Sequence, residues 1–239
     1  GTHSVTNWLY NIDANLIPFT GTGVPKYANV HAGFYHAWMR SRDEVLYKVQ
    51  LVIKKVGNFP IRVIGHSLGG AIAVHAGLDL ATNGKLQVHN VAGLQIAKTG
   101  SAYDVETPLD HILSSSSDNE DVSTGATQVQ VKWPIYTYGQ PRVGNPTWVN
   151  YAGTKMGAIW RVVHYKDIVP HLPPISICAA RHATTEVYYD ENFITKHQCS
   201  LYDGEDATCS NQFALPSSIA NHLEYFSYHL GSPADPDDC

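Results

Sequence analysis

The chain has 239 residues, which suits one large α/β domain and allows a substantial hydrophobic core. Hydrophobic residues make up 44% of it and charged residues only 15%, against about 25% in an average domain, so the composition excludes a disordered protein. The formal net charge of −5 provides no basic patch for nucleic acid, and no apolar run approaches the ~20 residues of a membrane-spanning helix.

Two helices are predicted in the first quarter of the chain. Within residues 5–19, apolar side chains recur at the spacing of one helical face: Val5, Trp8, Leu9 and Ile12. This short helix either docks on the core or forms a mobile cover over a site, and the residues leave both interpretations open. A long amphipathic helix is predicted over residues 34–56, where Gly57 and Asn58 end it.

A strand, a glycine-rich turn and a helix follow. Residues 61–65 (IRVIG) form a β-branched strand, and residues 69–84 (GGAIAVHAGLDLATNG) form the helix, so together they make half of a βαβ unit. Residues 99–128 hold four consecutive serines and an acidic cluster with little periodicity. We interpret this stretch as an exposed surface insertion.

Strands and helices alternate again in the second half. Strands are predicted at 131–139 and 158–165, with a short peripheral strand at 186–190, and helices at 146–156 and 222–230. This alternation predicts a mostly parallel sheet in a single α/β domain that spans residues 1–239.

The pattern G-x-S-x-G at residues 65–69 places Ser67 between the predicted strand and helix, as a nucleophile elbow requires. We expect small residues at 65 and 69 because Cβ atoms there would collide with a strained serine. The turn would raise the serine hydroxyl above the carboxyl ends of the strands and aim the N–H of Leu68 at an oxyanion. The alternative is a small residue where a strand turns into a helix.

A serine nucleophile needs a histidine base and a carboxylate, and in this fold they follow the serine in the order acid, then histidine. Asp167 comes directly after the strand at 158–165, so it should reach the same sheet edge; its alternative role is to cap a turn. Five histidines follow it: His171, His182, His197, His222 and His229. His171 is held in a proline-rich segment, whereas His222 opens the last predicted helix from a loop, so we predict His222 as the base.

The four cysteines are Cys178, Cys199, Cys209 and Cys239. Cys199 and Cys209 bracket a polar turn that a disulfide could close, and the alternative is two reduced cysteines. The chain contains neither a CxxC nor an HExxH pattern, so no metal site is expected.

Four separated motifs occur in order: GHSLGG at 65–70, YTYGQPRVGNP at 136–146, KDIVPHLPP at 166–174 and NHLEYF at 221–226. Together they resemble the class 3 lipases of filamentous fungi, with similarity over residues 1–98 and about 130–239. The resemblance implies an α/β-hydrolase fold and a secreted triacylglycerol lipase that needs no cofactor. It maps the triad onto Ser67, Asp167 and His222, and it implies a Cys199–Cys209 disulfide.

The resemblance also assigns roles to the first residues of the chain. Thr2 would be the second oxyanion donor, beside Leu68. Residues 5–12 would be a lid whose apolar side chains cover the site in water and turn outward at a lipid surface, where burial is favourable by ~25 cal/mol per Å². The lid residues would be Val5, Trp8, Leu9 and Ile12.

Family members carry strands and helices ahead of the oxyanion loop, whereas this sequence opens on that loop and so would lack the first strands. We therefore expect a separately cleaved N-terminal fragment of the same precursor as a partner, disulfide-linked through Cys239. Cys178 would be free or would pair with Cys239 instead.

Three rival functions remain. A feruloyl esterase shares the fold, but its lid region tends to be polar, whereas Trp8 and Leu9 favour a lipid-water interface and acylglycerol substrates. A phospholipase A1 or galactolipase would differ in loops that the sequence does not define. A lipase-like binding module without catalysis is disfavoured because every triad and oxyanion position is occupied.

Overall fold

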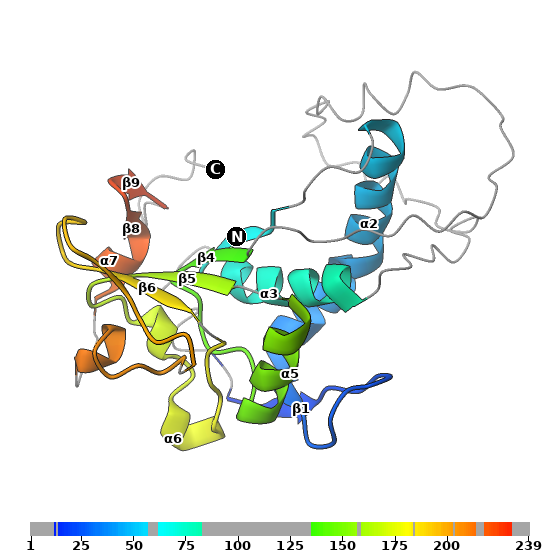
Figure 1. Cartoon of the computed structure of the whole chain (residues 1–239), viewed down its shortest axis with the longest axis horizontal. Coiled ribbons are helices and arrows are strands. Elements are labelled where there is room, and N and C mark those ends of the chain that lie inside the picture. Colours follow the sequence, from blue (N-terminus) through cyan, green and yellow to red (C-terminus); the bar gives the residue numbers. More distant parts are fainter. Residues whose placement is uncertain are drawn as a thin grey trace, which may run out of the picture.

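The computed structural model describes residues 12, 14–56, 62–82, 135–156, 159–183, 185–202, 204–213 and 218–230 (Figure 1). The predicted insertion at 99–128 lies outside these ranges. Helices in the described part are α2 (Ala32–Val56), α3 (Leu68–Thr82), α5 (Pro146–Met156), α6 (Ile175–Cys178) and α7 (Ile219–Leu223). Two short 3₁₀ helices join them, η1 (Val169–His171) and η2 (Ser210–Gln212).

The central sheet has the strand order β3-β4-β5-β6-β7. Its strands are β3 (Ile64–His66), β4 (Ile135–Tyr138), β5 (Ile159–His164), β6 (Glu186–Tyr189) and β7 (Lys196–Gln198). The first four run parallel, with Gly65 opposite Thr137 and Tyr138 opposite Val162, whereas β7 is antiparallel to β6. The predicted mostly parallel sheet is confirmed.

Parallel pairing determines where the functional side chains meet. Ser67 directly follows β3, Gly139 directly follows β4, and Asp167 comes three residues after the end of β5. Because parallel strands present their carboxyl ends at one edge of the sheet, these three residues from distant parts of the chain lie at the same edge.

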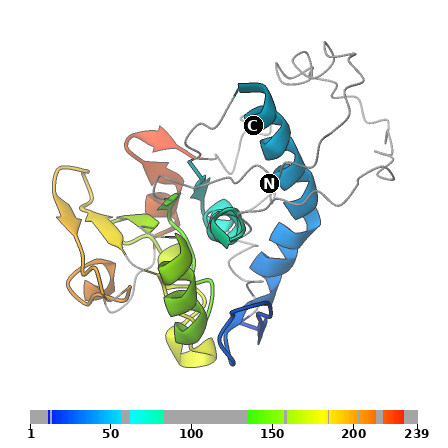
Figure 2. The same cartoon turned by 45° about the vertical axis from the view of Figure 1, so that its right-hand side comes forward.

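Helix α3 packs between the sheet and the long helix α2. Figure 2 shows α3 almost end-on, with α2 on one side and α5 and the strands on the other, and α3 contacts all of these elements. Fully buried side chains from four of them fill the space: Val74 of α3, Phe34 of α2, Ile135 of β4 and Trp148 of α5. The core therefore holds the helix that begins beside Ser67 in a fixed place.

The predicted helix over residues 222–230 is wrong. The helix there, α7, ends at Leu223, and a hairpin of β8 (Glu224–Tyr225) and β9 (Tyr228–His229) follows. Phe226 and Ser227 have φ values of 54° and 66°. This left-handed pair forms a two-residue hairpin turn, which an α-helix cannot contain.

Strand β6 is not peripheral, because β5 and β7 pair with it on both sides and β7 forms the edge. The sequence also did not predict the short antiparallel pair of β1 (Leu16–Pro18) and β2 (Asn29–His31) that precedes α2. Within the described ranges, no helix combines the length and apolar character that crossing a lipid bilayer requires.

Candidate active site

Ser67 occupies a strained turn between β3 and α3. Its φ is 55°, in the left-handed region that side chains other than glycine adopt at a cost of about 1–3 kcal/mol. The turn is held by three backbone hydrogen bonds: the N–H of Ser67 donates to the carbonyl of Tyr138 at 2.9 Å, and its carbonyl accepts from Gly70 N at 2.9 Å and from Ala71 N at 3.3 Å. The backbone strain that the sequence predicted at this position is confirmed.

Of the two glycines in the G-x-S-x-G motif, only Gly65 lies too close to neighbouring atoms to carry a side chain. A Cβ at Gly65 would lie 2.2 Å from the carbonyl oxygen of Gly69, a separation that no side chain tolerates. A Cβ at Gly69 would meet nothing within 4 Å, so the predicted steric reason for glycine there is wrong. The second close approach is at Gly70, where a Cβ would lie 3.2 Å from both Gly65 O and the Cβ of Gln140.

His222 and Asp167 form a fully buried pair. His222 Nδ1 lies 3.0 Å from each carboxylate oxygen of Asp167, and neither side chain is exposed. Two further donors hold the carboxylate: Val169 N lies 2.9 Å from Oδ1, and Tyr225 OH lies 2.6 Å from Oδ2. These bonds fix the orientation of the acid that faces the imidazole.

The pair also determines which ring nitrogen of His222 is free. Because an ionised carboxylate only accepts hydrogen bonds, Nδ1 carries the proton and Nε2 keeps its lone pair. His222 Nε2 is buried and has no hydrogen-bond partner among the described residues. A buried imidazole with an unoccupied lone pair is suited to accept a proton from a hydroxyl.

Gly139 connects the serine turn with the His222–Asp167 pair. It follows Tyr138, whose carbonyl accepts from Ser67, and its φ is 54°. A Cβ at Gly139 would lie 2.7 Å from both Asp167 Oδ2 and His222 Nδ1. Sequence reasoning did not identify this residue, although a glycine directly after a buried strand is a recognisable signal.

His66 supports the histidine from the other side. Its ring stacks on that of His222 with centroids 4.5 Å apart and planes 26° apart, and its Nε2 lies 2.9 Å from His222 O. Burial lowers the pKa of His66 to about 4, and so does the repulsion that a second positive charge would meet beside the His222 ring, so His66 is neutral at pH 7. Burial and the negative charge of Asp167 raise the pKa of Tyr225 well above 10, which keeps its hydroxyl protonated as a donor.

The other four candidate histidines do not hydrogen-bond to Asp167. His182 is buried and contacts Pro170 O, and burial lowers the pKa of His171 to about 4. His197 lies on β7 and His229 on β9, and both strands are exposed at these positions. Of the five, only His222 therefore hydrogen-bonds to the predicted acid.

Some of the remaining predicted residues lie within the described ranges and others lie outside them. Leu68 opens α3, and it packs with Ile12 against the main core cluster. Cys199 and Cys209 form a disulfide, and Cys178 is unpaired within the described part of the chain. Five predicted residues lie outside the described ranges: Thr2, Val5, Trp8, Leu9 and Cys239.

One cluster with metal-ligand chemistry occurs in the part of the chain that the structure describes. Glu186 and the sulfur atoms of Cys199 and Cys209 lie within 4.8 Å of one another. Both sulfurs belong to the disulfide, so neither offers the thiolate that a metal would bind.

A strained serine at a strand-to-helix turn, beside a buried histidine–carboxylate pair at the carboxyl edge of a parallel sheet, is the arrangement of serine hydrolases with the α/β-hydrolase fold. Comparison with known proteins narrows this class. The family model described as "Lipase (class 3)" matches residues 1–102 and 113–177. The chain belongs to the class 3 lipase family.

Two relatives illustrate the sequence similarity. A lipase of Rhizomucor miehei is 30% identical over 97% of the chain, and a secreted mono- and diacylglycerol lipase of Fusarium solani is 28% identical over 95%. The chain spans 51% and 54% of these two proteins, about half the length of each.

Solved structures agree on the fold. The Rhizomucor miehei lipase in complex with its propeptide matches with a TM-score of 0.68 at 28% identity, over 97% of this chain and 60% of that one. A triacylglycerol lipase whose catalytic centre is described as a serine protease triad matches with a TM-score of 0.67 at 28% identity, over 97% of this chain and 70% of that one.

Proposed function

We propose that the protein is a lipase that hydrolyses carboxylic esters of acylglycerols, with Ser67 as nucleophile, His222 as general base and Asp167 as the orienting carboxylate. The observation that carries this proposal is the bond from His222 Nδ1 to Asp167 at 3.0 Å, next to a strained Ser67 at the same sheet edge. Membership of the class 3 lipase family supports it.

The reaction has two acyl-transfer steps. His222 Nε2 removes the Ser67 proton, Oγ attacks the ester carbonyl, and His222 then protonates the departing alcohol. Water attacks the acyl-enzyme in the second step and gives its proton to His222, which releases the fatty acid and restores the serine. Asp167 stays ionised throughout and stabilises the imidazolium that forms in each step.

The oxyanion is stabilised by backbone N–H groups. Leu68 is the first residue of the fifteen-residue helix α3, so its N–H is unused by the helix and lies at the positive end of the helix dipole. We assign the second donor to Thr2. Together these donors would hold the developing negative charge in a site from which water is excluded.

The physiological setting is a lipid–water interface outside the cell. Val5, Trp8 and Leu9 form the apolar face of a lid that opens when this face gains a lipid surface, and Ile12, which packs against the main core cluster, holds its end. The Cys199–Cys209 disulfide supports secretion, because such bonds persist in oxidising compartments, and one relative is named a secreted lipase.

A cleaved N-terminal fragment of the same precursor is the proposed protein partner. The solved complex of a related lipase with its propeptide supports this. Intact-mass measurement of the natural protein with and without reductant tests the link through Cys239. One species whose mass rises only by the two hydrogens gained when Cys199–Cys209 is reduced contradicts it.

The activity is tested with three substrates in parallel: a long-chain triglyceride emulsion, a short-chain soluble ester and methyl ferulate. We expect hydrolysis of the triglyceride to rise sharply above the solubility limit. Ser67→Ala should abolish turnover and leave the midpoint of thermal unfolding nearly unchanged, whereas residual turnover would remove Ser67 from the mechanism. Preference for methyl ferulate would favour the feruloyl esterase instead.

A further inference from the structure

The segment that follows Asp167 is held by an unusual set of hydrogen bonds. Four consecutive backbone carbonyls, those of residues 170–173, all accept from just two residues. Arg142 Nη1 donates to His171 O and, at 3.2 Å, to Pro173 O, and the backbone N–H of Arg142 donates to Leu172 O at 2.7 Å. His182 Nε2 lies 2.6 Å from Pro170 O.

Both donors are oriented by one carboxylate, that of Glu205. Its Oε1 accepts from Arg142 Nε at 2.9 Å and from His182 N at 3.0 Å, and its Oε2 accepts from Arg142 Nη2 at 2.8 Å and Asn211 Nδ2 at 3.2 Å. The side chains of Arg142 and Glu205 are only 4% and 13% exposed. Burial alone would raise the pKa of Glu205, but Arg142 and its neighbours His182 and Arg161 hold it far below its usual value.

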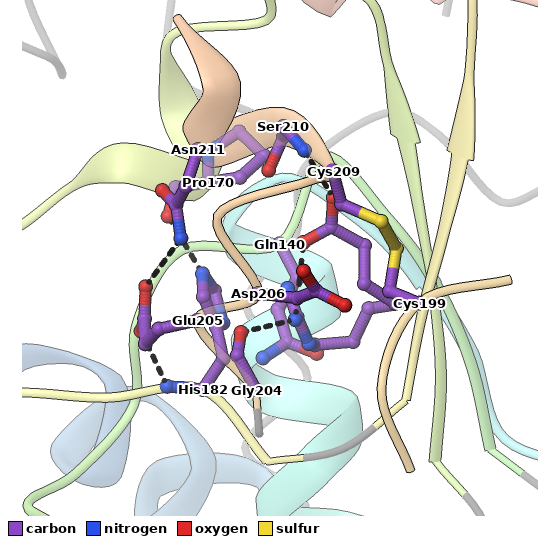
Figure 3. A network of polar contacts seen from close by, with 12 residues as sticks. Gln140, Pro170, His182, Cys199, Gly204, Glu205, Asp206, Cys209, Ser210 and Asn211 are labelled. Carbon is purple, nitrogen blue, oxygen red and sulfur yellow. Dashed lines mark hydrogen bonds and ion pairs between the residues drawn. A yellow bond between two sulfur atoms is a disulfide. The ribbon is translucent and has the colours of Figure 1, made fainter. Parts of the chain in front are cut away.

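Glu205 itself is carried by the disulfide loop. Cys199 and Cys209 enclose it, and Gly204 O accepts from the buried Arg161 at 2.8 Å. Figure 3 shows Glu205 facing His182, with Pro170 close by and the disulfide beside the same loop. The loop, the carboxylate and the segment after Asp167 thus form one connected polar network.

We propose that the Arg142–Glu205 pair is a positioning device for Asp167, an inference that rests on the proposed function. Asp167 accepts a hydrogen bond from Val169 N, and Val169 is the first residue of the 3₁₀ helix η1. The network binds the carbonyl of His171, the last residue of η1, and the two carbonyls that follow it. If the network loosens, this short helix shifts and Asp167 loses its alignment with His222. Asp167 acts on the reaction only through His222, so we expect the effect to fall on turnover.

Glu205→Gln is the sharpest perturbation. Each carboxylate oxygen of Glu205 receives two donors, so whichever way the glutamine amide turns, its NH₂ group faces two N–H donors. Asp79→Asn is the matched control, because Asp79 accepts from Arg42 and Trp38, both at 2.7 Å, on the helices α2 and α3. It removes a partly buried ion pair without touching residues 167–173.

The kinetic test measures kcat and KM on a soluble ester in the complete natural protein. A misplacement of about 1 Å can cost about 100-fold in rate, so Glu205→Gln should lower kcat by about 10- to 100-fold with KM changed less than about two-fold. Asp79→Asn should leave both constants unchanged. Arg142→Lys keeps the charge but loses the forked donors to Glu205 and the Nη1 donor to His171 O and Pro173 O. It should lower kcat in the same way and serves if Glu205→Gln does not fold.

A spectroscopic measurement separates this proposal from the catalytic one. The proton on His222 Nδ1, hydrogen-bonded to Asp167, should be observable by NMR in the wild type and in Asp79→Asn, and should broaden or vanish in Glu205→Gln and Arg142→Lys. An inactive wild-type protein would refute the proposed function, and the NMR signal of the His222 Nδ1 proton would then still test the positioning role of the Arg142–Glu205 pair. A retained proton signal, or a folded Glu205→Gln protein with wild-type kcat, would overturn the positioning role.

Discussion

Gly139→Ala should strongly lower the proposed esterase activity although residue 139 carries no functional group. The added Cβ would lie 2.7 Å from Asp167 Oδ2 and from His222 Nδ1, and 2.9 Å from His222 Cε1. An ordinary van der Waals contact begins at 3.4 Å, so the histidine and the carboxylate must each retreat by about 0.7 Å. Neither has free space, because both side chains are fully buried.

Two costs follow from this geometry. If the His222–Asp167 pair is catalytic as proposed, a displacement approaching 1 Å lowers the rate by about 100-fold, so kcat should fall by about that factor while KM changes little. The φ of 54° at residue 139 adds strain for alanine, and the free energy of unfolding should fall by about 1–3 kcal/mol. Activity is thus more sensitive than stability, since the native fold survives a loss of this size.

The assay pairs initial rates on a soluble ester with urea unfolding of the same preparation. Gly153→Ala is the matched control: a Cβ at Gly153, inside α5, meets nothing within 4 Å, so this variant should keep full activity and gain up to about 1 kcal/mol of stability. If Gly139→Ala folds and turns over at the wild-type rate, the packing of residue 139 against the His222–Asp167 pair is refuted.

Three further predictions concern the buried polar groups. Tyr225→Phe removes the 2.6 Å bond to Asp167 and should cost about 1.5–3 kcal/mol in urea unfolding, with a smaller loss of kcat than Ser67→Ala; unchanged stability contradicts it. Burial lowers the pKa of His75 to about 3. As the pH falls below 6.5, His75 therefore binds a proton in the unfolded chain but not in the folded chain. The free energy of unfolding should fall between pH 6.5 and about pH 3 for this reason. His75→Leu should therefore show a shallower fall of the thermal midpoint from pH 7 to pH 4 than the wild type, and an equal slope would exclude this contribution. Replacing Cys199 and Cys209 by alanine should lower the free energy of unfolding by about 2–3 kcal/mol, given the sequence separation of 10, and a midpoint unchanged by the double substitution would rule this out.

Features that depend on neighbouring residues were predictable from the sequence. The turn around Ser67 lies within a few consecutive residues, and its strained backbone is confirmed. Helix α5 spans residues 146–156 as predicted, because its apolar positions recur at the helical period and Gly157 follows. The mostly parallel sheet also followed from the alternation of strands and helices.

The hairpin after α7 shows where local patterns mislead. Residues 222–230 contain apolar side chains at helical spacing, yet the chain turns at Phe226 and Ser227. Tyr225 is 3% exposed because its hydroxyl reaches Asp167 across the sheet edge. That long-range hydrogen bond and the burial of the ring outweigh the weak helical preference of this short segment.

The sequence by itself determined the serine turn, the order of the candidate catalytic residues and the class of fold, since each is encoded in a contiguous motif or in the succession of motifs. Tertiary structure decided that His222 bonds to Asp167, that Gly139 packs against both, and that Arg142 and Glu205 hold the segment after Asp167. Arg142 and Glu205 stand 63 positions apart, and only the register of the parallel strands and the closure of the disulfide loop bring such residues into contact. Sequence motifs alone do not predict which residues distant along the chain come into contact, because the packing of the whole domain sets the distances between them.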